Sequence, residues 1–179
     1  MENNRYLKEH GVTMIEGKKS KGSFVMPYVT GIPLITYFRS LAEADKEKFY
    51  HKFDKLWQLT LSSSEPVPYE EVDWERFNPW WDEEKEEKAR SRIDRKKWRR
   101  VAFGTEVERE NLGIVLKQGY PDLVLLNGFL VNDEFVFYDQ EIFIRNFPAK
   151  AIMLRNIDFL YHGDVQMQKL LPREELLKR

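Results

Sequence analysis

The stretch DLVLLNGFLVNDEFVFYD, residues 122–139, is the most informative part of the chain. It contains two strand-like runs, Phe129–Val131 and Glu134–Tyr138, separated by Asn132 and Asp133. Asn and Asp tolerate the left-handed backbone conformation that a two-residue hairpin turn requires. The pattern therefore predicts a β-hairpin that turns at Asn132-Asp133.

Polar side chains flank this hairpin at both of its ends. Asp122 and Asn127 precede the first strand, and Asp139 follows the second. Because a hairpin returns the chain to the edge where it began, we expect these side chains to lie close together. Carboxylate and amide oxygens suit Mg²⁺, and a spare carboxylate can take a proton from an attacking hydroxyl group. This combination is typical of phosphoryl transfer, in which positioning and charge neutralisation do most of the catalysis.

The segments on either side of the hairpin predict an α+β fold. Near the N-terminus, Val12–Glu16 and Ser23–Tyr28 read as two strands around a basic turn bounded by glycines. Apolar periodicity and end signals predict helices from Pro33 to Leu41, from Asp45 to Leu61, over 106–118, from Asn146 to Leu160 and from Pro172 to the end. The apolar stripe of the second helix, Asp45 to Leu61, should face the core, and the lysines of this helix should face solvent. The stripe consists of Phe49, Phe53, Leu56, Trp57 and Leu61, and the lysines are Lys46, Lys48, Lys52 and Lys55.

Residues 62–100 differ in composition from the rest of the chain. A loop signal at 62–68 is followed by Trp74, Trp80 and Trp81, and from Asp82 to Arg100 nearly every residue is charged. We expect the charged part to be a solvated helix. Two interpretations of the tryptophans remain open: they fasten the loop to the domain, or they form a surface for a partner protein.

Length and composition exclude several classes of function. With 179 residues, 42% of them hydrophobic, the chain can bury one core, so we predict a single domain over 1–179. A net charge of −1 gives no field that attracts nucleic acid, and the absence of cysteine excludes thiolate chemistry. The sequence has no apolar run of about 18 residues and no signal-peptide core, which predicts a cytoplasmic protein without a membrane span.

Asp122-x-x-x-x-Asn127, a hairpin and then Asp139 resembles the catalytic loop and metal-binding aspartate of the protein-kinase-like fold, particularly its aminoglycoside and small-molecule kinase branch. Upstream, FVMPYVTGIPL (24–34) resembles the last small-lobe strand, the hinge and the first large-lobe helix of that branch. Residues 120–161 are also similar to kinase-like blocks of bacterial enzymes that assemble cell-surface polysaccharides.

The resemblance implies a mainly helical kinase-like large lobe. Residues 31–179 would form this lobe, with a charged insertion at about 63–105, and 1–30 would be a remnant small-lobe hairpin and hinge. Two chemical roles follow from the matched motif: Asp122 would be the catalytic base, and Asn127 and Asp139 would bind Mg²⁺.

The same resemblance implies a nucleotide and an acceptor. The backbone around Met26, Tyr28 and Val29 would face the adenine of ATP, and the acceptor would be the hydroxyl group of a small molecule or sugar. About 25 residues precede this hinge-like segment, whereas the family's glycine-rich loop, ATP-contacting lysine and partner glutamate need roughly 80 more. We therefore do not expect independent activity, and we expect a partner protein or an adjoining polypeptide, which would meet residues 74–100.

Two other interpretations compete with an active phosphotransferase. In the first, the chain is a non-catalytic kinase-like module that binds a partner protein through its tryptophan-rich insertion, Trp74–Trp98. In the second, it is an unrelated α+β domain whose acidic residues are merely solvated. The second interpretation predicts that Asp122, Asn127 and Asp139 do not converge in three dimensions.

Overall fold

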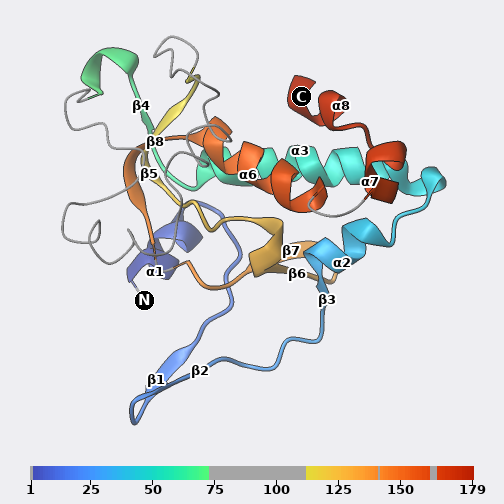
Figure 1. Cartoon of the computed structure of the whole chain (residues 1–179). Helices are drawn as coiled ribbons and strands as arrows, with labels where there is room; N and C mark the ends of the chain where they lie inside the picture. Colours follow the sequence, from blue (N-terminus) through green and yellow to red (C-terminus); the bar gives the residue numbers. More distant parts are fainter. Residues whose placement is uncertain (1, 73–111, 141, 162–164) are drawn as a thin grey trace.

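A computed structural model of the chain describes residues 2–72, 112–140, 142–161 and 165–179, and all structural statements concern these residues. The described part is an α+β structure (Figure 1). Its helices are α1 (Glu2–Glu9), α2 (Leu34–Arg39), α3 (Lys46–Ser62), α6 (Ala149–Tyr161), α7 (Val165–Leu170) and α8 (Arg173–Lys178). Its strands are β1 (Lys18–Ser20), β2 (Ser23–Val25), β3 (Ile32–Pro33), β4 (Pro66–Val67), β5 (Val115–Gly119), β6 (Gly128–Val131), β7 (Glu134–Phe137) and β8 (Ile144–Pro148).

The strands form small antiparallel sheets. The orders are β1-β2, β3-β6-β7 and β4-β5-β8. In Figure 1 the β1-β2 hairpin projects away from the remaining elements, while α3 and α6 lie side by side. The predicted hairpin is confirmed: β6 and β7 pair with Val131 opposite Glu134, and Asn132 and Asp133 have φ values of 50° and 66°.

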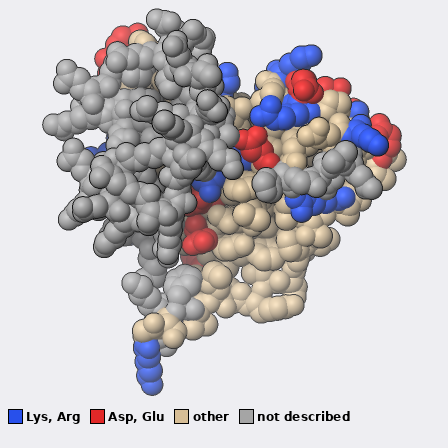
Figure 2. Space-filling model, in the orientation of Figure 1, with Lys and Arg blue, Asp and Glu red and all other residues tan. Residues whose placement is uncertain are grey.

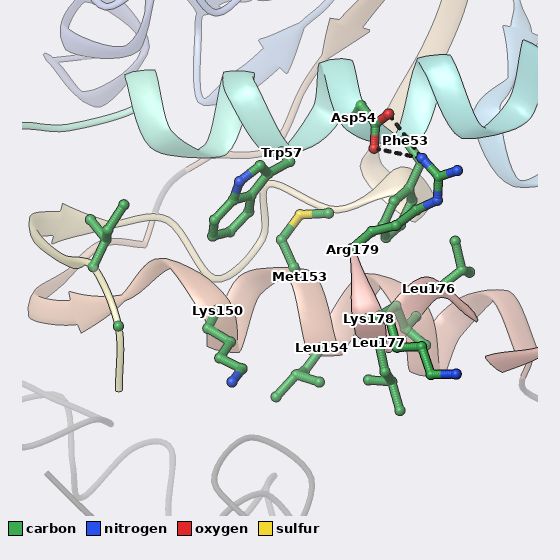
Figure 3. A pocket seen from close by; sticks show the side chains of 13 residues that line it. Phe53, Asp54, Trp57, Lys150, Met153, Leu154, Leu176, Leu177, Lys178 and Arg179 are labelled. Carbon is green, nitrogen blue, oxygen red and sulfur yellow. Dashed lines mark hydrogen bonds and ion pairs between the residues drawn. The ribbon is translucent and has the colours of Figure 1, made fainter. Parts of the chain in front are cut away.

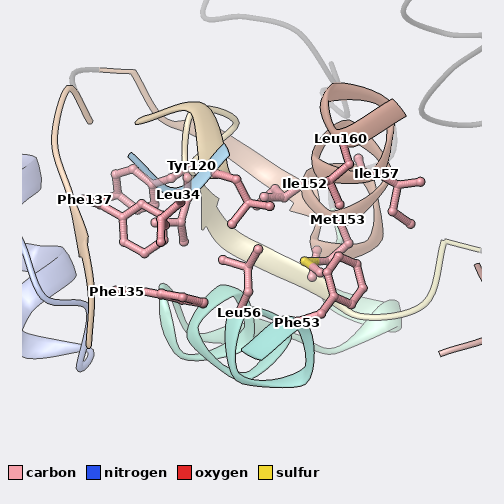
Figure 4. Packing of buried hydrophobic residues seen from close by; sticks show 14 of the residues in the cluster. Leu34, Phe53, Leu56, Tyr120, Phe135, Phe137, Ile152, Met153, Ile157 and Leu160 are labelled. Carbon is pink, nitrogen blue, oxygen red and sulfur yellow. The ribbon is translucent and has the colours of Figure 1, made fainter. Parts of the chain in front are cut away.

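The main hydrophobic core includes side chains of α2, α3, α6 and the β6-β7 hairpin, and Figure 4 shows part of it; a smaller separate cluster consists of Val72, Leu112 and Val115. Phe53 and Leu56 of α3 lie opposite Ile152 and Met153 of α6, and Phe135 of β7 packs beside them. The predicted helix from Asp45 and the burial of Phe49, Phe53 and Leu56 are therefore confirmed, whereas Trp57 and Leu61 are only partly buried.

Lys52 departs from the predicted pattern of α3, because it is only 9% exposed instead of facing solvent. Its ammonium group pairs with Asp133 at the tip of the β6-β7 hairpin. The same group lies 5.9 Å from the ring centroids of both Tyr37 and Phe135. A carboxylate and two aromatic faces thus compensate for the lost hydration, and the lysine fastens the hairpin tip to α3.

The N-terminal region differs from the prediction. The first hairpin has strands Lys18–Ser20 and Ser23–Val25 with its turn at Lys21-Gly22, so Val12–Glu16 is not its first strand. Met14 forms a parallel bridge with Phe137 instead, and the Ile15 amide donates to the Phe137 carbonyl at 2.8 Å. The reason is burial: Val12, Met14 and Ile15 need a core, which the β6-β7 hairpin provides and the projecting β1-β2 hairpin does not.

Two predicted helices are corrected by strand pairing. Residues 115–119 are strand β5, so the described part of the predicted 106–118 helix is not helical, and residues 106–111 lie outside the described residues. The last long helix begins at Ala149 rather than near Asn146, because Ile144–Pro148 is strand β8. Val115 pairs with Pro148 and Gly119 with Ile144. Each segment forms a strand because it has the other as a partner, which apolar spacing within either one does not reveal.

Two other predicted helices are present, and two predicted segments lie outside the described residues. The helix after Pro33 is α2, which ends at Arg39 and leaves Leu41 outside it, and the C-terminal helix after Pro172 is α8. The tryptophan-rich stretch and the charged helix predicted over 82–100 lie outside the described residues. Across the described ranges, the structure has no helix that is both long and apolar enough to cross a membrane. In Figure 2 acidic and basic side chains are interspersed on the described part of the visible face.

Candidate functional site

The β6-β7 hairpin positions the candidate site at its open end. Beyond the last pair of the ladder, Gly128 opposite Phe137, the amide of Tyr138 donates to the carbonyl of Asn127 at 3.1 Å. Asp139 comes next and has a φ of 58°, a left-handed conformation that ends the strand. The hairpin therefore brings Asn127 and Asp139 to the same edge.

One backbone atom ties the two sides of this edge together. The carbonyl oxygen of Asp122 accepts hydrogen bonds from the Val124 amide at 2.8 Å, from Asn127 Nδ2 at 3.1 Å and from Gln140 Nε2 at 2.7 Å. Gln140 Nε2 also donates to the Tyr138 carbonyl at 2.9 Å. Because Asn127 precedes the hairpin and Gln140 follows it, the Asp122 carbonyl fixes the loop before the hairpin against the segment after it.

The Asp122 side chain has a cationic partner. Its Oδ1 lies 2.9 Å from Nη2 of Arg155 on α6, and the two side chains are 22% and 20% exposed. Burial is the main influence on this carboxyl group and raises its pKa; Arg155 acts in the opposite direction, and the nearby Asp139 raises the pKa further. The pKa of Arg155 is lowered by its own burial, against the effect of Asp122. The pair is thus held largely out of water, with a second carboxylate close by.

A second polar residue of α6 holds the loop from below. Asn156 is fully buried, and its Oδ1 accepts a hydrogen bond from the Leu125 amide at 2.8 Å. Its Nδ2 donates to the carbonyls of Leu123 and Ile152 at 3.3 and 3.1 Å. A buried amide whose donors and acceptor are all used fixes its neighbours firmly. The loop before the hairpin is therefore anchored to α6 at Asp122, Leu123 and Leu125.

The structure brings some of the predicted site residues together and leaves others apart. Asp122, Asn127 and Asp139 lie at the open end of the hairpin: Asn127 Nδ2 donates to the Asp122 carbonyl, and Asp139, which is exposed, is near enough to raise the pKa of Asp122. Met26, Tyr28 and Val29 lie on the extended segment between β2 and β3, where Met26 is 45% and Tyr28 93% exposed. Within the described ranges they make no hydrogen bond to the other three residues.

The hairpin end carries an amide and a carboxylate, the kinds of oxygen donor that magnesium uses. Because Asn127 Nδ2 donates to the Asp122 carbonyl, Oδ1 of the same amide faces away from that bond. Asp139 is exposed and lies near enough to influence the pKa of Asp122. Among the described residues no group of three His, Cys, Asp or Glu side chains could hold a metal by itself. Mg²⁺ commonly uses one or two protein oxygens together with water and phosphate, so an amide oxygen and a carboxylate satisfy its chemistry.

Sequence reasoning missed three residues of this site: Gln140, Arg155 and Asn156. Asn156 carried a usable signal, because it interrupts the apolar stripe of α6 between Ile152 and Leu160, and a polar residue on a buried face needs partners. Gln140 and Arg155 carried no comparable signal, since a single Gln after a strand and a single Arg in a helix are ordinary.

Comparison of the chain with protein-family models, with curated proteins and with solved structures gives no significant match.

Proposed function

We propose that the chain is the large-lobe part of a kinase-like phosphotransferase, which transfers a phosphoryl group from a magnesium nucleotide to the hydroxyl group of a small molecule or sugar. The observation that carries the proposal is the Asp122 carbonyl, which accepts hydrogen bonds from both Asn127 and Gln140. These bonds hold Asp122, Asn127 and Asp139 at one end of the hairpin, in the chain order of the resembled motif.

Asp122 is the proposed proton acceptor. Burial raises the pKa of its carboxyl group, which makes it a better base than an exposed aspartate once it is ionised. The hydroxyl oxygen of the acceptor forms a bond to phosphorus while the bond to the leaving nucleotide oxygen breaks, and the hydroxyl proton passes to the Asp122 carboxylate. Arg155 favours the ionised form of this carboxylate, against the effect of burial, and fixes its orientation through the contact of 2.9 Å.

Asn127 and Asp139 are the proposed metal-holding residues, through the amide oxygen and the carboxylate. When bound, Mg²⁺ would neutralise negative charge on the nucleotide phosphates. The hydrogen bond from Asn127 Nδ2 to the Asp122 carbonyl fixes the orientation of the Asn127 side-chain amide. Its Oδ1 would therefore be oriented for the metal before the metal binds.

The other parts of the proposal rest on the resemblance. The segment that contains Met26, Tyr28 and Val29 would contact adenine, and its backbone groups make no hydrogen bond within the described ranges. The similarity of 120–161 to blocks from polysaccharide-assembling enzymes suggests a sugar acceptor and a cytoplasmic reaction. Further phosphate contacts would come from an adjoining polypeptide or a partner that meets residues 74–100.

Thermal unfolding with and without magnesium ATP tests the proposal. A ligand at ten times its Kd stabilises the native state by about 1.4 kcal/mol, which raises the Tm of a chain of this size by about 3–5 °C. We expect that rise for the unaltered chain at millimolar Mg·ATP, and we expect Asp139→Asn to abolish it, because the amide lacks the charge that attracts the metal.

Asp133→Asn is the matched control. Asp133 and Asp139 both have positive φ values, 66° and 58°, and both are exposed, but Asp133 lies at the opposite end of the hairpin. The control variant should keep the full nucleotide-dependent rise in Tm even though its basal Tm changes. An unaltered chain whose Tm does not respond to millimolar Mg·ATP would overturn the proposal.

A second candidate is a non-catalytic kinase-like module, and the Asp122–Arg155 ion pair favours it. A carboxylate held at 2.9 Å by a guanidinium is less available to an incoming hydroxyl group than a free one. In this case Mg·ATP would still raise the Tm, but ³²P from labelled ATP would not appear in any sugar acceptor, even after the adjoining polypeptide is added. Labelled acceptor would favour the phosphotransferase instead.

A further inference from the structure

A pocket separate from the candidate site lies between α3, α6 and the C-terminal helix α8 (Figure 3). Its volume is about 400 Å³, within the range of small-molecule sites. Residues just before β5, Gly113 and Ile114, complete its wall. None of Asp122, Asn127 and Asp139 lines it, so the proposed function does not use it.

The interior surface of the pocket is apolar. Phe53, Met153, Ile157 and Leu176 are nearly fully buried, while Ile114 and Leu177 are 44% and 42% exposed. The buried side chains belong to the core, whereas the exposed ones lie at the rim, where water contacts them. A ligand with an alkyl chain would remove this rim surface from water and would contact few polar atoms.

The charged side chains around the pocket leave a net positive charge. Arg179 is neutralised locally, because its Nη1 lies 3.1 Å from Oδ2 of Asp54 and its guanidinium lies 4.1 Å from the Tyr50 ring centroid. Lys150 and Lys178 are exposed, and neither makes an ion pair within the described ranges. Figure 3 shows both lysines extending away from α3, with Leu154 and Leu177 between them.

From this combination we infer that the pocket binds a fatty acid. The alkyl chain lies on the apolar wall between α3 and α6, and the carboxylate stays at the mouth, where it pairs with Lys150 or Lys178. A peptide would fit less well, because a peptide backbone in the pocket needs hydrogen-bond acceptors as well as donors. The polar groups of the wall are the Trp57 indole N–H, two lysines at the mouth and an Asp–Arg pair that satisfies itself.

Isothermal titration of the whole chain with octanoate, decanoate and dodecanoate, each below its critical micelle concentration, tests the apolar part. Each buried methylene strengthens binding by up to about fourfold, so each step of two carbons should lower Kd by about five- to fifteenfold, at one ligand per chain. A Kd that does not change with chain length would overturn the proposal, as would the absence of saturable dodecanoate binding.

Reversal of the charges of Lys150 and Lys178 tests whether the carboxylate of the ligand lies at the mouth of the pocket. Lys150→Glu/Lys178→Glu should weaken dodecanoate binding by about tenfold, since exposed ion pairs contribute little each and two are replaced by repulsion. Dodecanol should bind this variant and the unaltered chain equally. The control Lys18→Glu/Lys169→Glu changes net charge by the same amount at exposed lysines that do not line the pocket, and should leave Kd unchanged. Equal weakening by both double variants would overturn the assignment to this pocket.

Methyl NMR locates the ligand. The chain has five methionines, of which Met153 lines the pocket and accepts a weak hydrogen bond from Thr60 at 3.5 Å. In protein labelled with ¹³C at the methionine methyl groups, dodecanoate should shift the Met153 signal, which Met153→Leu identifies by its loss. The Met14 signal, from a core residue that forms a β-bridge beside β7, should stay in place. An unmoved Met153 signal at saturation, or saturable binding of an amphipathic helical peptide in place of dodecanoate, would overturn the proposal.

Discussion

When the two charges of the Asp122–Arg155 pair are removed separately, the two losses of stability should add up to more than the loss caused by removing both together. At 2.9 Å and an effective dielectric constant of about 20, the attraction between the charges is about 6 kcal/mol. The two side chains are only 22% and 20% exposed, so loss of hydration opposes this attraction. Because the pKa of Asp122 is raised, the hydration loss is the larger of the two effects on its carboxylate.

The magnitudes follow from which charge is left behind. Arg155→Met leaves a carboxylate partly buried beside Asp139, and should lower the free energy of unfolding by about 2–3 kcal/mol, the low end for a broken buried pair because some exposure remains. Asp122→Asn leaves the guanidinium, which can still donate to an amide oxygen and lies 5.4 Å from the Phe159 ring centroid, so the loss should be about 1–2 kcal/mol. The double variant should lose about 1–2 kcal/mol, which gives a coupling energy of about 2 kcal/mol.

Urea unfolding of the four proteins at pH 7, in EDTA so that bound metal does not contribute, measures these quantities. The coupling energy is the difference between the loss in the double variant and the sum of the single losses. If the losses add to within about 0.5 kcal/mol, the two groups do not interact in solution. The description of the site as a buried ion pair would then be wrong.

Three further predictions concern the β6-β7 hairpin and helix α3. Gly128→Ala should cost about 2–3 kcal/mol in urea unfolding, because a Cβ there would lie 2.6 Å from Cδ1 of Leu34. Asn132→Val should cost about 1–2 kcal/mol while Asn132→Gly is nearly neutral, because φ is 50° and a β-branched residue is strained there. Burial and the hydrogen bond to Glu175 raise the pKa of Tyr50 to about 12 from 10.0, so its contribution to stability is complete below pH 10 and is lost as pH rises towards 12. Tyr50→Phe should therefore reduce the fall in Tm between pH 10 and 12; an unchanged slope would contradict the burial of this hydroxyl group.

Local signals predicted the parts of the fold that local chemistry determines. The Asn132-Asp133 turn was predictable because few residues other than glycine tolerate positive φ at both turn positions. Helix α3 was predictable because its apolar residues recur at helical spacing over seventeen residues. The convergence of Asp122 and Asp139 followed from the hairpin between them, without knowledge of any other element.

Non-local pairing determines the parts that were missed. Strand β5 exists because Leu116 lies opposite Phe147, about 30 residues later in the chain, and neither segment alternates strictly between apolar and polar residues. Lys52 is buried because the hairpin tip places Asp133 above it. The same reason applies to Arg155: its role depends on where the loop before the hairpin lies, and only the packed structure specifies that.

A single turn of α6 contributes side chains to both the apolar pocket and the candidate site. Successive residues of a helix point about 100° apart. Accordingly Leu154 lines the pocket, Arg155 pairs with Asp122, and Asn156 holds the loop through Leu123 and Leu125. A substitution at 154 therefore alters the pocket and leaves the hydrogen bonds of the loop intact, whereas one at 156 removes three hydrogen bonds under the site. Because α6 forms a wall of both regions, any ligand that displaces this helix changes both at once, and a ligand that leaves it in place acts on one alone.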